Sequence, residues 1–312
     1  MAARSASELA VSPDGERPKV IYVMGAGRSG TTILGVTLGN CADFVFAGEL
    51  NQWLAKSGVP TYNGPQRTQF WQRVLGDMDG AAEMFGGQAS VLERSSSLLD
   101  IRTWPARRRL RRPYRRLAGD LYHAIARAAG VAYVVDTSHY PLRARELQRV
   151  GGIELYLLYV ARSPHGVVAS LNRDDVPERR FDLRTANSYL WLTHLMSVFV
   201  FLRHPRERRL FLHHEDFLES PEAVLRQILE WCGSSAALPD LTSLHTGMPL
   251  HGNRLVASSV VALKRQTSRS EQRSRTTALL QLPWTAIHSR LRPVASRAPV
   301  QTDLGPAKAH SR

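Results

Sequence analysis

The sequence predicts an α/β fold, a parallel β-sheet flanked by helices, from two observations. Three apolar runs have the length and continuity of strands that are buried on both faces of a sheet: residues 20–24, 131–135 and 153–161. Segments with apolar residues at helical spacing follow these runs or separate them: residues 31–38, 140–150, 164–172 and 183–202. Strands that alternate with helices in this way pair in parallel, and the helices cover both faces of the sheet.

A further strand and helix are predicted in the second half of the chain. Residues 209–213 read as a strand, and Ser220 can cap the helix that follows, with Pro221 at its first position. The helical pattern runs to Trp231, and Gly233 ends it.

The chain of 312 residues, 43% of them hydrophobic, is long enough to bury a core without disulfides or metal ions. We expect residues 1–17 to be disordered, residues 18–285 to form one domain and residues 286–312 to form a flexible basic tail. Cys41 and Cys232 lie among apolar neighbours, which predicts buried thiols in a reducing compartment. The first residues contain no apolar segment of the kind that directs secretion, so we expect a cytoplasmic protein.

The net charge of +14 at pH 7 and the pI of about 10.5 predict contact with anionic partners. Eight arginines lie between Arg102 and Arg116. They form either a solvated basic helix, which is the simpler interpretation, or a patch that contacts an anionic acceptor or the anionic inner face of a membrane. No motif that reads nucleic acid is present, so we expect no specific nucleic-acid partner. The most apolar run, residues 189–202, is shorter than the roughly 20 residues that span a bilayer and predicts a buried helix.

A glycine-containing turn, Gly25-Ala-Gly-Arg-Ser-Gly-Thr-Thr32, follows the first strand and opens the first helix. In this position backbone N–H groups and a helix N-terminus bind anions. The glycine spacing is that of a nucleoside-triphosphate loop, but Thr31 stands where such a loop has its lysine. Arg28 supplies a forked guanidinium instead, and Ser29, Thr31 and Thr32 supply hydroxyl groups. The turn therefore predicts a phosphate site and disfavours ATPases and kinases.

A second polar motif follows the strand at 153–161, where Arg162 is separated by eight residues from Ser170. Ser163 can cap the helix that begins here, and Pro164 can take its first position. Seven residues bring a helix back to within roughly 20° of its starting direction, so Ser170 lies on the face below Ser163. We expect Arg162 and Ser170 to reach one phosphate group.

Together the two motifs resemble those of the PAPS-dependent sulfotransferases (PAPS is 3′-phosphoadenosine-5′-phosphosulfate), in the bacterial branch of that family. The resemblance runs from residue 20 to about residue 231. In the family the R-S-G-T-T loop binds the 5′-phosphosulfate group, and the arginine and serine bind the 3′-phosphate. Asn253-Arg254 with Lys264-Arg265 loosely resembles its C-terminal nucleotide-binding loop. The resemblance implies a P-loop-type architecture, PAPS as the donor, no metal requirement, and nucleotide binding by Gly27, Arg28, Ser29, Gly30, Thr31, Thr32, Arg162, Ser170, Asn253 and Arg254.

The resemblance also implies the catalytic candidates. Related enzymes carry a Gly-Glu pair after the loop whose glutamate takes the acceptor proton, and Gly48-Glu49 stands in that place. A positioned carboxylate suits this chemistry because the acceptor hydroxyl becomes strongly acidic only as its bond to sulfur forms. Asp136-Thr-Ser-His139 resembles a second family motif, but the lysine of that motif is absent. Either His139 replaces the lysine as a donor, or Arg28 and backbone amides stabilise the developing charge alone.

The sequence thus predicts transfer of a sulfuryl group from PAPS to a hydroxyl or an amine, with Glu49 as the base. A non-catalytic module that binds PAPS, its product PAP or another anion is the alternative from a different class, and a P-loop nucleotide kinase is a weaker one. Carbohydrate, lipid, glycopeptide and small phenol acceptors all stay open, with the acceptor pocket expected in residues 52–116 and 173–192. Residues 213–216 (His-His-Glu-Asp) are interpreted as a strand end with structural acids, because neighbouring side chains on a strand point to opposite faces.

Overall fold

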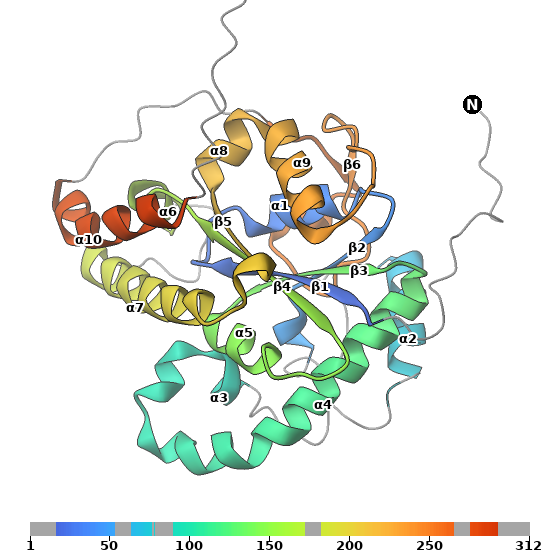
Figure 1. The fold of residues 1–312 in the computed structure, drawn as a ribbon, viewed down its shortest axis with the longest axis horizontal. Helices are drawn as coiled ribbons and strands as arrows, with labels where there is room; N and C mark the ends of the chain where they lie inside the picture. Colours follow the sequence, from blue (N-terminus) through green and yellow to red (C-terminus); the bar gives the residue numbers. More distant parts are fainter. Residues whose placement is uncertain are drawn as a thin grey trace, which may run out of the picture.

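The computed structural model describes residues 17–53, 64–76, 78, 90–171, 182–264 and 275–292. At its centre is a five-stranded parallel sheet with the strand order β2-β3-β1-β4-β5 (Figure 1). The strands are β1 (Lys19–Gly25), β2 (Phe44–Gly48), β3 (Tyr133–His139), β4 (Glu154–Ala161) and β5 (Arg209–His213). A separate antiparallel pair consists of β6 (Leu244–His245) and β7 (Val260–Val261). The predicted fold class is confirmed.

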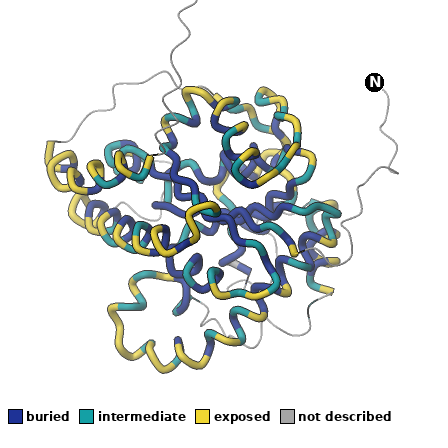
Figure 2. Tube along the Cα trace, viewed as in Figure 1, coloured by how far each residue is buried: buried dark blue, intermediate teal, exposed yellow. Residues whose placement is uncertain are grey.

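Two hydrophobic cores lie on opposite faces of this sheet. Along β1, Val20 and Tyr22 belong to one core, whereas Ile21 and Val23 belong to the other, as the alternation of side chains along a strand requires. The first core is completed by α2 (Pro65–Gly76), α4 (Trp104–Ala129), α5 (Pro141–Leu147) and α7 (Leu183–Leu202). The second core is completed by α1 (Thr31–Leu38), α8 (His214–Glu219) and α9 (Pro221–Cys232). Figure 2 shows the strands as the most continuously buried part of the chain.

Shorter elements connect these layers. The remaining α-helices are α3 (Ser90–Glu93), α6 (Pro164–Leu171) and α10 (Arg275–Leu291). Single turns of 3-10 helix occur at η1 (Leu50–Gln52), η3 (Ser95–Leu98), η4 (Ile101–Thr103), η5 (Arg206–Arg208) and η6 (Arg254–Ala257). Among the described residues, no helix has both the length and the apolar character needed to cross a bilayer.

Three sequence predictions need correction. The boundary at residue 285 is wrong, because α10 continues to Leu291 and buries Trp284 and His288. The helix at 189–202 is not buried all round, because Leu195 is 48% exposed and Leu202 51% exposed. The strand predicted at residues 131–135 is β3, and it does not end at Val135 but continues through three buried polar residues to His139. The disorder predicted at the two ends falls mainly on residues 1–16 and 293–312, which lie outside the described residues.

Candidate functional site

The predicted site residues gather at one edge of the sheet, where its parallel strands end. Glu49 follows β2, His139 ends β3, and Arg162 follows β4. The register pairs Met24 of β1 with His139 and pairs Gly25 with Val160, so the loop after β1 emerges between the ends of β3 and β4. In open α/β sheets ligands bind at this edge.

The loop after β1 is held in a conformation that its sequence permits. The N–H of Ser29 donates to the carbonyl of Ala26 at 3.2 Å, which closes a turn. Gly30 follows with a φ of +79°, and a Cβ atom at this position would lie 2.1 Å from the ring of His214. Arg28 also has a left-handed backbone, with a φ of 69°. An arginine in this conformation costs of order 1–2 kcal/mol, so the surroundings of the loop must stabilise it.

The loop offers open anion donors. No side chain caps the N-terminus of α1, and its first turn contains no acidic residue. The buried hydroxyl of Ser29 has no hydrogen-bond partner among the described residues. Thr31 and Thr32 are buried at the start of the same helix. A helix N-terminus with unsatisfied N–H groups and a buried free hydroxyl fits a phosphate or sulfonate group.

Arg162 supports this loop from the neighbouring strand. Its guanidinium donates to the carbonyl of Arg28 at 3.2 Å. The hydroxyl of Ser163 accepts the N–H of Gly166 at 3.2 Å, and α6 begins at Pro164, so the predicted cap is confirmed. Ser170 lies two helical turns along α6, about 10 Å from Ser163 along the helix axis. The structure therefore places Arg162 at the loop and Ser170 further along the helix that starts beside it.

Two residues that contact the loop were not identified from the sequence as site residues. The N–H of Gly27 donates to the hydroxyl of Tyr189 on α7 at 2.7 Å. Burial raises the pKa of Tyr189, which keeps it a neutral phenol. His214 packs against Gly30, and burial together with the charge of Arg162 lowers its pKa to about 4. His214 is therefore a neutral structural residue, consistent with the interpretation of residues 213–216 as a strand end.

Glu49 is held by backbone bonds from two directions. Its N–H donates to the carbonyl of His251 at 2.8 Å, and the N–H of Leu250 donates to the carbonyl of Ala47 at 2.9 Å. Two residues later, the N–H of Asn51 donates to the hydroxyl of Ser138 at 3.0 Å. The Glu49 side chain is half-buried. Its backbone position is thus fixed by the C-terminal segment on one side and by β3 on the other.

The C-terminal segment also reaches α1, the helix that follows the loop after β1. The side-chain amide of Asn253 donates to the hydroxyl of Thr32 at 3.2 Å, and its oxygen accepts the N–H of Leu255 at 2.9 Å, which caps η6. Arg254 is the exposed first residue of η6, and Lys264 is also exposed. Arg265 lies outside the described residues. Asn253 thus bonds the C-terminal segment directly to the helix that follows the loop.

A buried network of charged and phenolic groups lies behind Glu49. Asp136 accepts hydrogen bonds from Tyr122 at 2.6 Å, from Arg143 at 3.0 Å and from the N–H of Ser138 at 2.8 Å. Arg143 also pairs with Glu93 at 3.2 Å. Burial raises the pKa of Glu93 to about 7. The network fixes Ser138, the residue that accepts the N–H of Asn51, so Asp136 acts on the site through the backbone.

His139 occupies the position where the resembling motif has its lysine. Its backbone is left-handed, with a φ of 54°. Its ring lies 4.4 Å from the ring of Tyr140, whose carbonyl accepts the hydroxyl of Tyr22 at 2.9 Å. Within the described residues, no group of three or more His, Cys, Asp or Glu side chains is arranged to hold a metal ion.

Comparison with known proteins identifies the fold. No family model matches the sequence, and no curated protein matches it. A solved structure titled as the sulfotransferase domain from the curacin biosynthetic pathway is similar, at 15% identity and a TM-score of 0.50, over 86% of this chain and 98% of that one. The sulfotransferase domain of the Synechococcus PCC 7002 olefin synthase is 19% identical, over 88% of this chain and 97% of that one, with a TM-score of 0.49. The chain therefore has the fold of the sulfotransferases.

Proposed function

We propose that this protein is a PAPS-dependent sulfotransferase that transfers the sulfuryl group to a hydroxyl, or an amine, of an acceptor. One observation carries the proposal. The loop after β1 has anion donors but no lysine, and Arg162 at the end of the next strand bonds to the loop backbone. These donors suit a sulfonate and a 3′-phosphate better than the γ-phosphate of ATP, because the loops that bind ATP hold its γ-phosphate with a lysine.

The proposed chemistry places charge stabilisation and proton transfer on different strands. Glu49 takes the proton of the acceptor hydroxyl as the acceptor oxygen bonds to sulfur. The bond between sulfur and the 5′-phosphate oxygen breaks at the same time, and Arg28 with the loop N–H groups binds the negative charge left on PAP. Because β3 separates β2 from β1, the backbone of Glu49 lies about 10 Å from the end of β1, which leaves room for the reacting groups.

Recognition of the nucleotide is assigned to the loop after β1, to the start of α6 and to the C-terminal segment. Ser29, Gly30, Thr31 and Thr32 hold the 5′-phosphosulfate group through backbone and hydroxyl donors, while the N–H of Gly27 stays bonded to the hydroxyl of Tyr189. The 3′-phosphate is then read by Arg162 and Ser170, and the nucleotide is covered by Asn253 and Arg254.

We place the enzyme in the cytoplasm. Cys41 and Cys232 are free and buried, and burial raises the pKa of Cys41 to about 12 and that of Cys232 to about 11. Thiols of this kind stay protonated and unreactive at neutral pH. A protein whose cysteines are buried thiols suits a reducing compartment.

The second candidate is a module that binds PAP or PAPS without turnover. It is favoured by His139, which stands where the resembling motif has a lysine. In the catalytic proposal His139 donates a hydrogen bond to the transferring group. Turnover separates the two candidates, because both bind the nucleotide and only one transfers sulfur.

Thermal unfolding with nucleotides tests the donor. PAP at 100 times its Kd is expected to raise the Tm by about 5 °C or more, whereas ATP with magnesium at the same concentration changes it little. Stabilisation by ATP and not by PAP would reject the proposal in favour of a kinase. Incubation with sulfur-labelled PAPS and a lysate of the source cell then tests turnover. Binding of PAP without any labelled product would favour the non-catalytic module.

A further inference from the structure

The arginines of α4 divide into two sets that face in different directions. Arg107 is buried and donates to the carbonyl of Val91 and to the hydroxyl of Ser97. The carboxylate of Glu146 pairs with Arg115 at 2.7 Å and with Arg111 at 3.3 Å. These three arginines are part of the folded structure and fix the start of α4 against α5 and η3.

The other set faces solvent. Arg108, Arg112 and Arg116 are exposed at a spacing of four residues, which places them along one face of the helix. Arg102 is exposed one turn before the helix begins. Arg116 lies 3.9 Å from Asp120, but both side chains are highly exposed and such a pair is weak. A stripe of positive charge therefore runs along the outer face of α4.

Large apolar side chains protrude at the start of this stripe. Leu99 is 77% exposed, Ile101 71% and Trp104 50%. We call these three residues the apolar tip. The indole N–H of Trp104 donates to the carbonyl of Leu98 at 3.3 Å, which holds the ring at the surface. Monomeric proteins seldom expose several large apolar residues next to each other without a partner.

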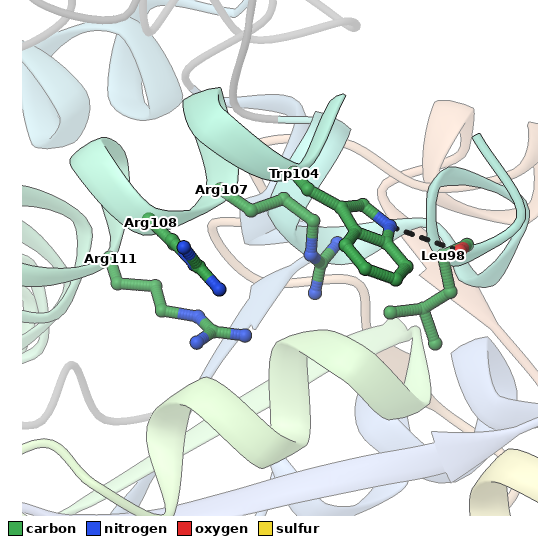
Figure 3. A pocket seen from close by; sticks show the side chains of 5 residues that line it. All are labelled: Leu98, Trp104, Arg107, Arg108 and Arg111. Atoms are coloured by element: carbon green, nitrogen blue, oxygen red, sulfur yellow. Dashed lines mark hydrogen bonds between the residues drawn. The ribbon is translucent and has the colours of Figure 1, made fainter. Parts of the chain in front are cut away.

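An arginine-lined hollow lies directly beside the apolar tip. Its volume is about 200 Å³, and its lining residues are Leu98, Trp104, Arg107, Arg108 and Arg111. Figure 3 shows the arginine side chains extending from α4 next to the indole of Trp104. Since Arg107 is hydrogen-bonded to Ser97 and Arg111 is ion-paired with Glu146, the exposed Arg108 is the lining arginine best placed to bind an added anion. The hollow has the size and charge for one phosphate group.

We propose that the apolar tip and the arginine stripe of α4 dock the protein onto a membrane that contains anionic phospholipids. In this arrangement the apolar tip enters the interface between headgroups and acyl chains, where Trp side chains are favoured, and Arg108 binds a lipid phosphate in the hollow. The outer arginines face the negative lipid surface. A nucleic acid would use the arginines but would leave the apolar tip exposed to water, so the combination favours a membrane.

The direction of α4 gives this contact a defined orientation. The helix ends at Ala129, shortly before β3 begins, so its first turn points toward the edge where the strands end. Measured along its axis, the 26 residues of α4 amount to about 39 Å, with a kink expected at Pro113, against about 23 Å for a strand of seven residues. In Figure 1 the start of α4 lies on the same side of the molecule as α6 and α7. Docking through the apolar tip therefore turns the candidate site toward the membrane.

Co-sedimentation with lipid vesicles tests the proposal without any assay of activity. The full chain is expected to bind vesicles that contain 30% phosphatidylglycerol and to bind pure phosphatidylcholine vesicles much less. Each arginine near an anionic surface contributes about fivefold to the partition coefficient, so Arg108→Gln with Arg112→Gln should lower it about 25-fold. Leu99→Ser with Ile101→Ser should lower it about tenfold or more while the charge is unchanged.

Matched controls remove the same chemistry elsewhere on the surface. Arg206→Gln with Arg226→Gln removes two exposed charges outside α4, and Leu279→Ser with Leu282→Ser removes two exposed apolar side chains of α10. Both control pairs are expected to bind vesicles within about twofold of the wild type. Equal losses in control and α4 variants would overturn the proposal, as would equal binding to both kinds of vesicle. Binding of a short DNA duplex that depends on Arg108 and Arg112, with no vesicle binding, would replace the membrane by a nucleic acid.

Discussion

In the proposed function the candidate site has a donor side, which binds the nucleotide, and an acceptor side, which carries Glu49, and the two sides satisfy their polar groups in different ways. On the donor side, around the loop after β1, the hydroxyl of Ser29 has no partner among the described residues and no side chain caps α1. On the acceptor side, behind Glu49, Asp136 and Arg143 are buried and bonded to each other. The donor side thus keeps hydrogen-bond donors free to bind the negative charge of a ligand. The acceptor side balances its own charge and uses it to fix the backbone on which Glu49 stands.

Glu49→Gln should have the largest effect, and it should be confined to chemistry. The amide keeps the size of the side chain but does not accept a proton at neutral pH. Loss of a general base costs roughly 10²- to 10⁴-fold, so kcat should fall by that factor while the Kd for PAP stays within a few-fold of the wild-type value. Steady-state kinetics with sulfur-labelled PAPS and the acceptor found in the lysate measure kcat, and calorimetric titration of PAP measures the Kd. Normal turnover would move the base to another residue, with His139 as the next candidate.

Asp136→Asn should separate stability from nucleotide binding. The substitution leaves the buried guanidinium of Arg143 with less negative charge around it, and breaking a buried pair of this kind costs about 3 kcal/mol or more. Urea unfolding measures the loss, and PAP binding to the folded fraction should change by no more than a few-fold. The matched control is Asp120→Asn, which removes the exposed partner of Arg116 and should cost less than about 0.5 kcal/mol. Equal costs for the two variants would show that the network does not stabilise the acceptor side.

Substitutions on the donor side should weaken ligand binding and leave the fold in place. Arg162→Ala should weaken PAP binding by about 2 kcal/mol because it removes a charge-assisted contact. Since Arg162 also bonds to the carbonyl of Arg28, part of this loss should extend to adenosine 5′-phosphosulfate, which has no 3′-phosphate. Ser170→Ala is the cleaner probe, with an expected loss of about 1 kcal/mol for PAP and none for adenosine 5′-phosphosulfate. Equal losses for both ligands in Ser170→Ala would remove that residue from the 3′-phosphate site.

A third polar cluster, formed by Tyr159, His194 and His288, lies away from both sides. Substitution in this cluster should have the smallest effect, which is a change in how the stability of the fold depends on pH. The hydroxyl of Tyr159 lies 2.9 Å from His194 and 2.9 Å from His288. Burial lowers the pKa of His194 to about 4 and that of His288 to about 3. The unfolded chain, in which histidine has a pKa near 6.5, therefore binds protons first, and stability falls as the pH drops below about 6.5.

The expected loss is about 1 kcal/mol per histidine between pH 7.5 and pH 5.5. His288→Gln should remove one histidine's share of this pH dependence. Urea unfolding of both proteins at the two pH values measures the difference. An unchanged pH dependence in His288→Gln would mean that His288 takes up its proton equally in the folded and unfolded chains.

The sequence predicted the donor side better than the acceptor side, and the reason is local. The strand, turn and helix of residues 20–38 follow one another directly in the chain, so the local sequence pattern is enough to predict their structure. Arg162 and Ser163 likewise follow directly from a strand end and a helix cap. On the acceptor side the supports of Glu49 are distant in the chain, and no short motif connects Glu93 or Arg143 with Asp136.

Three differences between the sequence predictions and the structure also have physical causes. β3 continues past Val135 because Asp136 and Ser138 are hydrogen-bonded inside the protein, which hydrophobic periodicity does not register. The C-terminal helix α10 is held by Trp284 and by the histidine cluster at Tyr159, although its composition is typical of a flexible tail. Tyr189 was placed in an apolar helix, and only the fold reveals that its hydroxyl meets the loop.

The contact of Asn253 with Thr32 joins residues that are 221 positions apart in the chain. A ribosome therefore makes the loop after β1 well before it makes the residue that bonds to Thr32. A nascent chain that ends before residue 244 has all five strands of the parallel sheet but lacks both the partner of Thr32 and the carbonyl that fixes Glu49. The candidate site is thus completed only after residues 251–253 have been made, so affinity for the proposed nucleotide should appear later than the parallel sheet.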